Sequence, residues 1–327
     1  MSAPDAPTTV LVTGGAGFIG SHLVEALLGA GWRVRVLDDL STGRRENLPR
    51  ATGLEFIEGS VLSSAALDAA AVGADRIVHL AAIASVARSV ADPEGTRRVN
   101  LDGTVAVLEA AERARARRVV FASSAAIYGD AGGGALREDR PADPQSPYGS
   151  QKWESERACA AFAREHGLET ACLRFFNVFG SRQRPDSDYS GVISVFVDHA
   201  ARGRAPVIYG DGEQTRDFVH VSDVVAGLIA AAERPGGAGA VVNIGTGVAT
   251  SVNRVWAEIA RIAGSRLAAH HVAPRAGEVR HSLADPARAF ERLGWRSKVS
   301  FADGLERLLA ERGIAAPPAP SGHSRKT

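Results

Sequence analysis

The sequence has little cysteine and no long apolar run. Its 327 residues include two cysteines, Cys159 and Cys172, which fall in a predicted helix and a predicted strand. We therefore expect buried reduced thiols, with no support for a disulfide framework or a metal site. No apolar run reaches the roughly 18 residues of a membrane span, so no membrane contact is predicted.

Net charge is also nearly absent, with 38 basic residues against 37 acidic ones. This balance provides no electrostatic footprint for nucleic acid or for an anionic membrane. Residues 1–9 lack the charged and apolar regions of a secretory signal. We therefore expect a cytoplasmic protein that binds neither nucleic acid nor membrane.

A glycine-rich turn is the first motif that is present. The apolar run 9–12 (TVLV) predicts a strand, and GGAGFIG (14–20) leads from it into a helix with apolar periodicity. A second predicted strand, 34–37, ends at Asp38. The glycines allow a pyrophosphate to approach the helix N-terminus, and an acid at this distance can bind an adenosine ribose. The pattern predicts a dinucleotide site, with NAD favoured over NADP because a 2′-phosphate would face a carboxylate.

Strands and helices then alternate along the chain. Strands are predicted at 54–57, 76–80 and 118–121, with helices near 63–70 and 100–115. This order predicts an α/β fold with a doubly wound parallel Rossmann sheet, and the chain length suggests a smaller second lobe. Ligands bind at the carboxyl ends of such strands, so the residues that follow each strand are candidates for function.

Tyr148 and Lys152 follow Pro147 at a spacing of four residues. A helix that begins there places both side chains on one face. A neighbouring ammonium lowers the pKa of a tyrosine, which otherwise titrates near pH 10 and is a poor base. Ser124, near a strand end, could pass a proton between the tyrosine and a substrate. Singly, the pair could be an ordinary helix start and the serine a turn cap; together they favour catalysis.

The chain resembles the extended short-chain dehydrogenase/reductases, and within them the NAD-dependent UDP-glucose and UDP-N-acetylglucosamine 4-epimerases. The resemblance covers about residues 9–312. The segments that carry it are GGAGFIGSH (14–22), VLDDLSTG (36–43), HLAA (79–82), SSAAIYG (123–129), SPYGSQK (146–152), RFFNVFG (174–180), GDGEQTRDFVHVSD (210–223) and AGEVRHSLAD (276–285).

The resemblance implies a reaction without net redox change. Tyr148 would take the proton of the sugar 4-hydroxyl, Lys152 would lower its pKa and hold the nicotinamide ribose, and Ser124 would bind the 4-oxygen. NAD would stay tightly bound, accept a hydride and return it to the other face of the 4-keto sugar. A homodimer is implied as well, paired through helices at about 100–116 and 150–166.

The resemblance also assigns the remaining site residues. Cofactor contacts are expected from Gly14, Gly17, Phe18, Ile19, Gly20, Asp38, Asp39, Ser60, Val61, Leu80, Ala81, Ala82, Asn100, Tyr148 and Lys152. Substrate contacts are expected from Ser85, Ser124, Asn177, Val192, Arg216, Arg275, Glu278 and Ser282. Two positions depart from the family pattern, because Ser60 replaces an aspartate and Ala87 a proline.

The expected domains interleave in sequence. The Rossmann domain covers 1–176, and the chain returns to it at 218–250, where 218–221 and 241–244 are predicted strands. The UDP-sugar lobe covers 177–217 and 251–312. The tail, 313–327, has the composition of a disordered segment.

Several relatives compete for the function. A 4,6-dehydratase needs an acid-base pair directly after the serine, where this chain has Ala125 and Ala126, so elimination would lack a proton donor. A UDP-glucuronate 4-epimerase remains an alternative, since its members share the run RQRPD (182–186), although they typically carry threonine at Asn177. A non-catalytic NAD sensor is a third possibility, but such proteins typically lose the tyrosine or the lysine.

One position bears on the sugar. In these epimerases a bulky tyrosine at the position of Ser282 excludes a 2-acetamido group. A small serine leaves room for it, and Ser85 is expected to hydrogen-bond it. We therefore expect both glucose-type and N-acetylglucosamine-type substrates.

Overall fold

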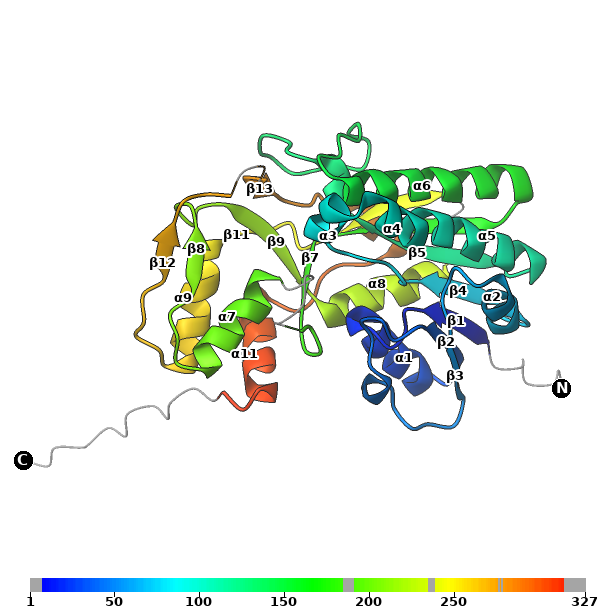
Figure 1. The fold of residues 1–327 in the computed structure, drawn as a ribbon, viewed down its shortest axis with the longest axis horizontal. Coiled ribbons are helices and arrows are strands. Elements are labelled where there is room, and N and C mark those ends of the chain that lie inside the picture. Colours follow the sequence, from blue (N-terminus) through cyan, green and yellow to red (C-terminus); the bar gives the residue numbers. More distant parts are fainter. Residues whose placement is uncertain (1–7, 185–190, 235–238, 276, 278, 315–327) are drawn as a thin grey trace, which may run out of the picture.

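The computed structural model describes residues 8–184, 191–234, 239–275, 277 and 279–314. These residues form a large sheet covered by helices on both faces and a smaller group of strands and helices at one end (Figure 1). None of the helices in this part of the chain is long and apolar enough to cross a bilayer.

The large sheet has seven parallel strands in the order β10-β6-β5-β4-β1-β2-β3. The predicted doubly wound Rossmann sheet is confirmed. The strands in the middle of this sheet are largely apolar because helices cover both of their faces. The strands are β1 (Thr9–Thr13), β2 (Arg33–Asp38), β3 (Leu54–Glu58), β4 (Arg76–His79), β5 (Arg118–Ser124), β6 (Glu169–Phe175) and β10 (Ala240–Ile244).

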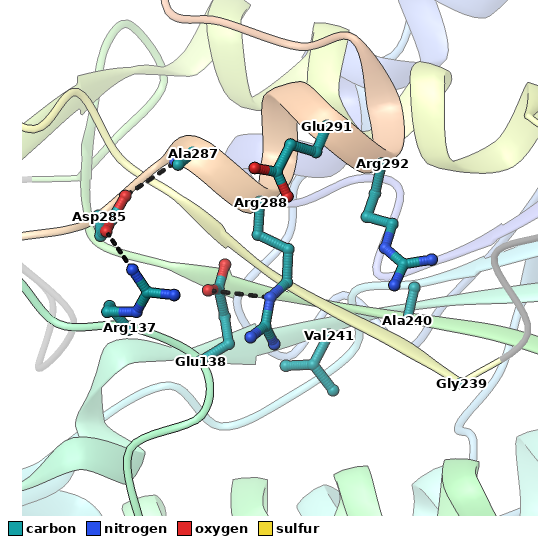
Figure 2. Close-up of a pocket in the computed structure, with 10 residues that line it drawn as sticks. All are labelled: Arg137, Glu138, Gly239, Ala240, Val241, Asp285, Ala287, Arg288, Glu291 and Arg292. Atoms are coloured by element: carbon teal, nitrogen blue, oxygen red, sulfur yellow. Dashed lines mark hydrogen bonds and ion pairs between the residues drawn. The ribbon is translucent and has the colours of Figure 1, made fainter.

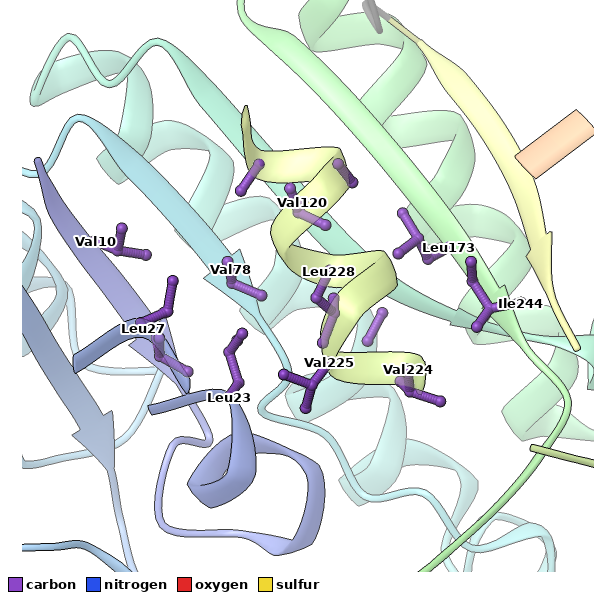
Figure 3. Close-up of a cluster of buried hydrophobic side chains, with 14 of the residues drawn as sticks. Val10, Leu23, Leu27, Val78, Val120, Leu173, Val224, Val225, Leu228 and Ile244 are labelled. Carbon is purple, nitrogen blue, oxygen red and sulfur yellow. The ribbon is translucent and has the colours of Figure 1, made fainter. Parts of the chain in front are cut away.

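Helices cover the two faces of this sheet as separate groups. One face carries α1 (Phe18–Gly29), α8 (Val221–Glu233) and α10 (Ala287–Leu293); the other carries α2 (Ser64–Ala71), α5 (Gly103–Arg113) and α6 (Pro147–His166). Apolar side chains of α1 and α8 meet those of the central strands in a single core (Figure 3). The two cysteines are buried and free in α6 and β6, as predicted.

The smaller part contains a four-stranded sheet and a two-stranded sheet. The former comprises β7 (Asn177–Phe179), β9 (Thr215–His220), β11 (Ala249–Ser251) and β13 (His281–Ser282); the latter, β8 (Val207–Tyr209) and β12 (His270–Val272). The helices α7 (Val192–Ala201), α9 (Val252–Ala263) and α11 (Phe301–Glu311) pack around a second core that includes Phe179 and Trp256.

Three expectations need correction. The segment 218–221 lies mostly in β9 of the smaller sheet, and only β10 returns to the large one, because an apolar strand pattern does not specify which sheet it joins. The helix expected at 100–115 is preceded by α4 (Pro93–Arg97) and by a π-helical turn (Arg98–Asp102). Strand β5 extends to Ser124, so this serine ends the strand rather than following it.

Candidate active site

The glycine turn is packed so closely that a Cβ would not fit at Gly14 or at Gly20. Gly14 has φ +71°, and a Cβ there would lie 2.7 Å from the backbone nitrogen of Ala81 at the end of β4. A Cβ on Gly20 would collide with the carbonyl oxygen of Gly14. Gly17, Phe18 and Ile19 start α1, so the unbonded N–H groups of its first turn face the end of the sheet. This narrow cradle at a helix N-terminus fits a pyrophosphate.

Asp38 ends β2 and holds the same turn. Its carboxylate is buried, with Oδ2 accepting from the Ala16 N–H (2.9 Å) and Oδ1 from the Leu40 N–H (2.9 Å). Burial raises the pKa of Asp38, and these two backbone hydrogen bonds oppose the rise. Each oxygen retains a lone pair, so the carboxylate can also accept from ribose hydroxyls. The residues present therefore fit a dinucleotide.

The first turn of α6 presents the tyrosine and the lysine. Ser146 caps the helix by accepting from the Gly149 N–H (3.2 Å), and Pro147 supplies a favourable first residue. The Tyr148 N–H donates to Ser89 Oγ (3.1 Å) of α3 (Val86–Ala91), which fixes the start of the helix. Sequence reasoning missed Ser89, because no local pattern links it to α6.

The electrostatics of the pair differ from the sequence expectation. Burial raises the pKa of Tyr148 to about 12, against a hydrogen bond with Ser124 that lowers it. Burial also lowers the pKa of Lys152 to about 8. The Lys152 ammonium donates to the Ala122 carbonyl (2.7 Å) and lies 5.9 Å from the centre of the Tyr148 ring. In the protein alone the cost of burying a phenolate exceeds the help from the Ser124 hydrogen bond.

The other predicted cofactor residues surround the same end of the sheet. Asn100 is buried, and its side-chain amide makes three hydrogen bonds within the protein. Its Oδ1 accepts from the Ile83 N–H (2.7 Å), and its Nδ2 donates to the Ile83 carbonyl (3.1 Å) and to Gln151 Oε1 (2.8 Å). Ser60 accepts from the Leu62 N–H (3.2 Å). The remaining residues follow strands as expected: Asp39 after β2, Val61 after β3, and Leu80, Ala81 and Ala82 after β4.

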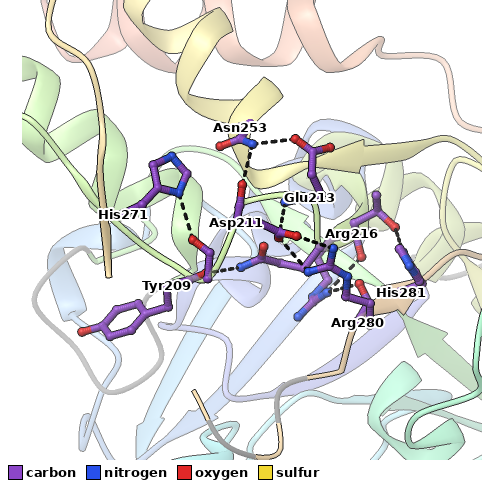
Figure 4. Close-up of polar contacts among 11 residues, drawn as sticks. Tyr209, Asp211, Glu213, Arg216, Asn253, His271, Arg280 and His281 are labelled. Carbon is purple, nitrogen blue, oxygen red and sulfur yellow. Dashed lines mark hydrogen bonds and ion pairs between the residues drawn. The ribbon is translucent and has the colours of Figure 1, made fainter. Parts of the chain in front are cut away.

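Three of the predicted substrate residues, Asn177, Arg216 and Ser282, lie in strands of the four-stranded sheet. Figure 4 shows Arg216 among the polar residues around it. Asn177 is exposed at the start of β7, and Ser282 in β13 is the register partner of Arg216 in β9. The guanidinium of Arg275 stacks on the ring of Tyr209 at 3.8 Å. Val192 begins α7, and Glu278 lies outside the described residues.

Two residues of this set have structural contacts. Ser85 is buried and caps α3 by accepting from the Arg88 N–H (3.1 Å). Arg216 donates to the Thr215 carbonyl (2.9 Å). Its neighbour Asp217 accepts four hydrogen bonds from residues 246, 247 and 284.

A separate cavity of about 510 Å³ lies beside the edge strand β10 (Figure 2). It contains none of the predicted site residues. Charged side chains line it, and two acids there form ion pairs with arginines, Glu138 with Arg288 and Asp285 with Arg137.

Comparison with known proteins agrees with this geometry. Residues 10–245 match the NAD dependent epimerase/dehydratase family. A UDP-glucose 4-epimerase of Mycolicibacterium smegmatis is 39% identical over 304 residues, covering 91% of this chain and 96% of that protein.

Two solved structures are similar over nearly their full length. A UDP-glucose 4-epimerase from Thermotoga maritima with UDP-glucose is 38% identical, with 94% of this chain and 99% of that chain covered and a TM-score of 0.90. A UDP-N-acetylglucosamine 4-epimerase from Methanobrevibacter ruminantium with UDP-N-acetylmuramic acid is 35% identical, with coverage of 93% and 97% and a TM-score of 0.89. The resemblance inferred from the motifs is confirmed, and the chain belongs to the NAD-dependent epimerase/dehydratase family.

Proposed function

We propose that this protein is a UDP-hexose 4-epimerase that uses NAD, with Tyr148 as the base for the sugar 4-hydroxyl. The observation that carries the proposal is the convergence of Tyr148, Ser124 and Lys152 at the carboxyl end of β5, at the same edge of the sheet as the glycine turn after β1. The glycine turn and Asp38 would hold NAD, which would supply the hydride acceptor for C4. The Ser124 hydroxyl orients the 4-oxygen and relays its proton to or from Tyr148.

The high pKa of Tyr148 in the protein alone has a consequence for this role. Lys152 alone does not bring Tyr148 into the range of a base at neutral pH. A cationic ligand beside the phenol favours the phenolate. We infer that Tyr148 becomes a phenolate, and so a base, only when the cofactor is bound. Before the cofactor binds, the buried tyrosine stays neutral.

Elimination, the competing reaction of the family, lacks its catalyst here. Ala125 and Ala126 begin the short 3-10 turn directly after Ser124. Neither side chain can donate or accept a proton, so epimerisation is supported over dehydration. NMR of the products from UDP-glucose, UDP-N-acetylglucosamine and UDP-glucuronate, incubated separately, tests the function. We expect C4 epimers from the first two, and a C4 epimer from UDP-glucuronate alone would replace this proposal with the glucuronate epimerase.

UDP-glucose and UDP-N-acetylglucosamine are both proposed as substrates because the side chain of Ser282 is small. It is half-buried in β13, next to Arg216 on β9. Replacing Ser282 with tyrosine should abolish turnover of UDP-N-acetylglucosamine and leave UDP-glucose within about threefold of the parent, since a filled pocket rejects the larger group. Ser282→Ala is the control and should retain both activities. If Ser282→Tyr still turns over the N-acetyl sugar at the parental rate, the gate lies elsewhere.

We further propose that the glycine turn, Asp38 and the strand ends of β3 and β4 hold the cofactor, with Asn100 positioning the loop after β4. Asn177, Val192, Arg216, Arg275 and Ser282 are proposed to hold the UDP-sugar, and the protein to act as a homodimer. An arginine suits the diphosphate because its planar fork donates hydrogen bonds in pairs.

A further inference from the structure

A buried carboxylate lies one helical turn beyond Lys152 and has no part in the proposed chemistry. Glu156 of α6 faces Arg174 of β6, and their side chains are 2% and 3% exposed. Glu156 Oε1 accepts from Ser123 Oγ (2.6 Å) and from Arg174 Nε (2.9 Å), and Oε2 accepts from Arg174 Nη2 (2.7 Å). Ser123 and Arg174 are register partners on adjacent strands, so one carboxylate joins α6 to both.

This contact is part of a longer buried network. The Arg174 guanidinium stacks on the Tyr128 ring at 4.8 Å, and the Tyr128 hydroxyl donates to Asn243 Oδ1 (2.7 Å) in β10. The charges are paired in a bidentate arrangement, which is the geometry that compensates best for their burial. Three neighbouring strands are therefore tied to one point on α6.

The same end of β5 bears the candidate catalytic contacts. Three consecutive residues of β5 lie against α6. The Ala122 carbonyl accepts from Lys152, the Ser123 hydroxyl donates to Glu156, and Ser124 is close enough to Tyr148 to lower the pKa of its hydroxyl. The contact of Ser123 with Glu156 therefore sets how α6 sits against the strand that carries Ser124. A displacement of about 1 Å can cost about a hundredfold in rate when reacting groups must align.

We propose that Glu156 is a positioning residue for the reaction, holding α6 against Ser123 and Arg174 so that Tyr148 and Lys152 stay aligned with Ser124. This proposal rests on the proposed epimerase function. A purely structural ion pair would stabilise the fold without affecting the alignment, and kinetics distinguish the two roles.

The charge of Glu156 also acts on Lys152. It favours the ammonium form, whereas burial disfavours it. The titratable or charged groups around Lys152 are Tyr148, Glu156 and Cys159 on α6, Cys172 and Arg174 on β6, and His79 on β4. Removing the Glu156 charge leaves the Arg174 cation uncompensated, which disfavours a second cation nearby.

The kinetic test uses two variants and a matched control. Ser123→Ala removes one contact and preserves the ion pair, while Glu156→Gln removes the charge. The control is Glu169→Gln, because Arg118 and Glu169 are register partners that form an ion pair at the opposite end of the same two strands. We expect kcat for UDP-glucose to fall roughly threefold to tenfold in Ser123→Ala and about tenfold to a hundredfold in Glu156→Gln. KM should stay within about threefold, and kcat of the control within about twofold.

The second readout does not need turnover. The chain has three lysines, Lys152, Lys298 and Lys326, so lysine-selective nitrogen-15 labelling gives three side-chain signals to titrate. We expect Lys152 to have a lower pKa in Glu156→Gln than in the parent, with the control unchanged.

The outcomes separate the two proposals. If the parent turns over no UDP-hexose, the proposed function fails, and the Lys152 titration then decides whether Glu156 acts on Lys152 at all. An unchanged Lys152 pKa in that case, or kcat within twofold of the parent in both Ser123→Ala and Glu156→Gln, overturns the role of Glu156. If Glu156→Gln does not fold, Ser123→Ala carries the kinetic decision.

Discussion

Tyr148 illustrates what a single residue's sequence context reveals and what it does not. The spacing to Lys152 and the preceding proline were sufficient to place both residues on one face of α6. The direction of the pKa change was not predictable, because it depends on how deeply the folded chain buries the tyrosine and on its hydrogen bond with Ser124, which is distant in sequence. Local patterns identify the groups, whereas their protonation depends on the tertiary surroundings.

Removing the Tyr148 hydroxyl gives the most direct test of its role. Tyr148→Phe should lower kcat for UDP-glucose by about a thousandfold, within the range for loss of a positioned acid-base group. Binding of the reduced cofactor NADH, followed by its fluorescence, should be nearly unchanged because the ring of residue 148 remains in place. Activity within tenfold of the parent would assign the base to another residue.

At the scale of elements, β1 and β4 are linked by a buried histidine. His79 Nδ1 contacts Thr13 Oγ1 (2.7 Å) and Nε2 contacts Thr104 Oγ1 (3.0 Å) of α5. Since the Thr104 hydroxyl donates to the Asn100 carbonyl (2.6 Å), it accepts from Nε2–H, which leaves Nδ1 as the acceptor for Thr13. The histidine is therefore neutral, and burial lowers its pKa to about 3.

This neutral histidine predicts acid sensitivity. Between the ordinary pKa of 6.5 and the folded value of about 3, the unfolded chain binds the extra proton, so stability falls as pH decreases through this window. The parent should lose about 4–5 kcal/mol of unfolding free energy over it from this group. His79→Gln should be less stable at pH 7 yet lose less between pH 7 and 4, as measured by urea unfolding. Parallel losses in both proteins would exclude His79 as the cause.

The glycine turn was fully recognisable from sequence, and its strain can be tested. Gly14→Ala should weaken NAD binding at least tenfold and lower the melting temperature, because the new Cβ meets the backbone of Ala81 at a positive φ. Gly29→Ala, at the other end of α1, has open space around its Cβ and should preserve both properties. Equal NAD binding by Gly14→Ala and the parent would contradict this tight packing.

At the scale of the whole molecule, Asp217 joins β9 to loops that follow β10 and β13. Its buried carboxylate accepts from Thr246 N–H (2.7 Å), Thr246 Oγ1 (2.7 Å), Gly247 N–H (2.8 Å) and Ala284 N–H (3.1 Å). The sequence predicted the strand at 241–244, which is β10 of the large sheet. It did not predict the partners of Asp217, because they are brought together only by the crossing of the chain between sheets.

Substituting Asp217 should therefore weaken the contact between β9 and the loops that follow β10 and β13. Asp217→Asn places an amide N–H₂ against several donors, and should cost about 2–4 kcal/mol of unfolding free energy in a denaturant titration. The matched change Asp211→Asn, in the exposed pair with Arg280, should have little effect. If Asp217→Asn loses no more unfolding free energy than Asp211→Asn, the hydrogen bonds of Asp217 do not stabilise the contact between the two sheets.

The position of β10 has a consequence for how the protein is made. Its partner β6 ends at Phe175, but β10 does not begin until Ala240, so the ribosome exposes an unpaired strand edge for the synthesis of more than sixty residues. At about 5–20 residues per second this interval lasts several seconds. A nascent chain arrested before Ala240 should therefore be captured by chaperones or aggregate, whereas release after α10 has emerged should allow the sheet to close.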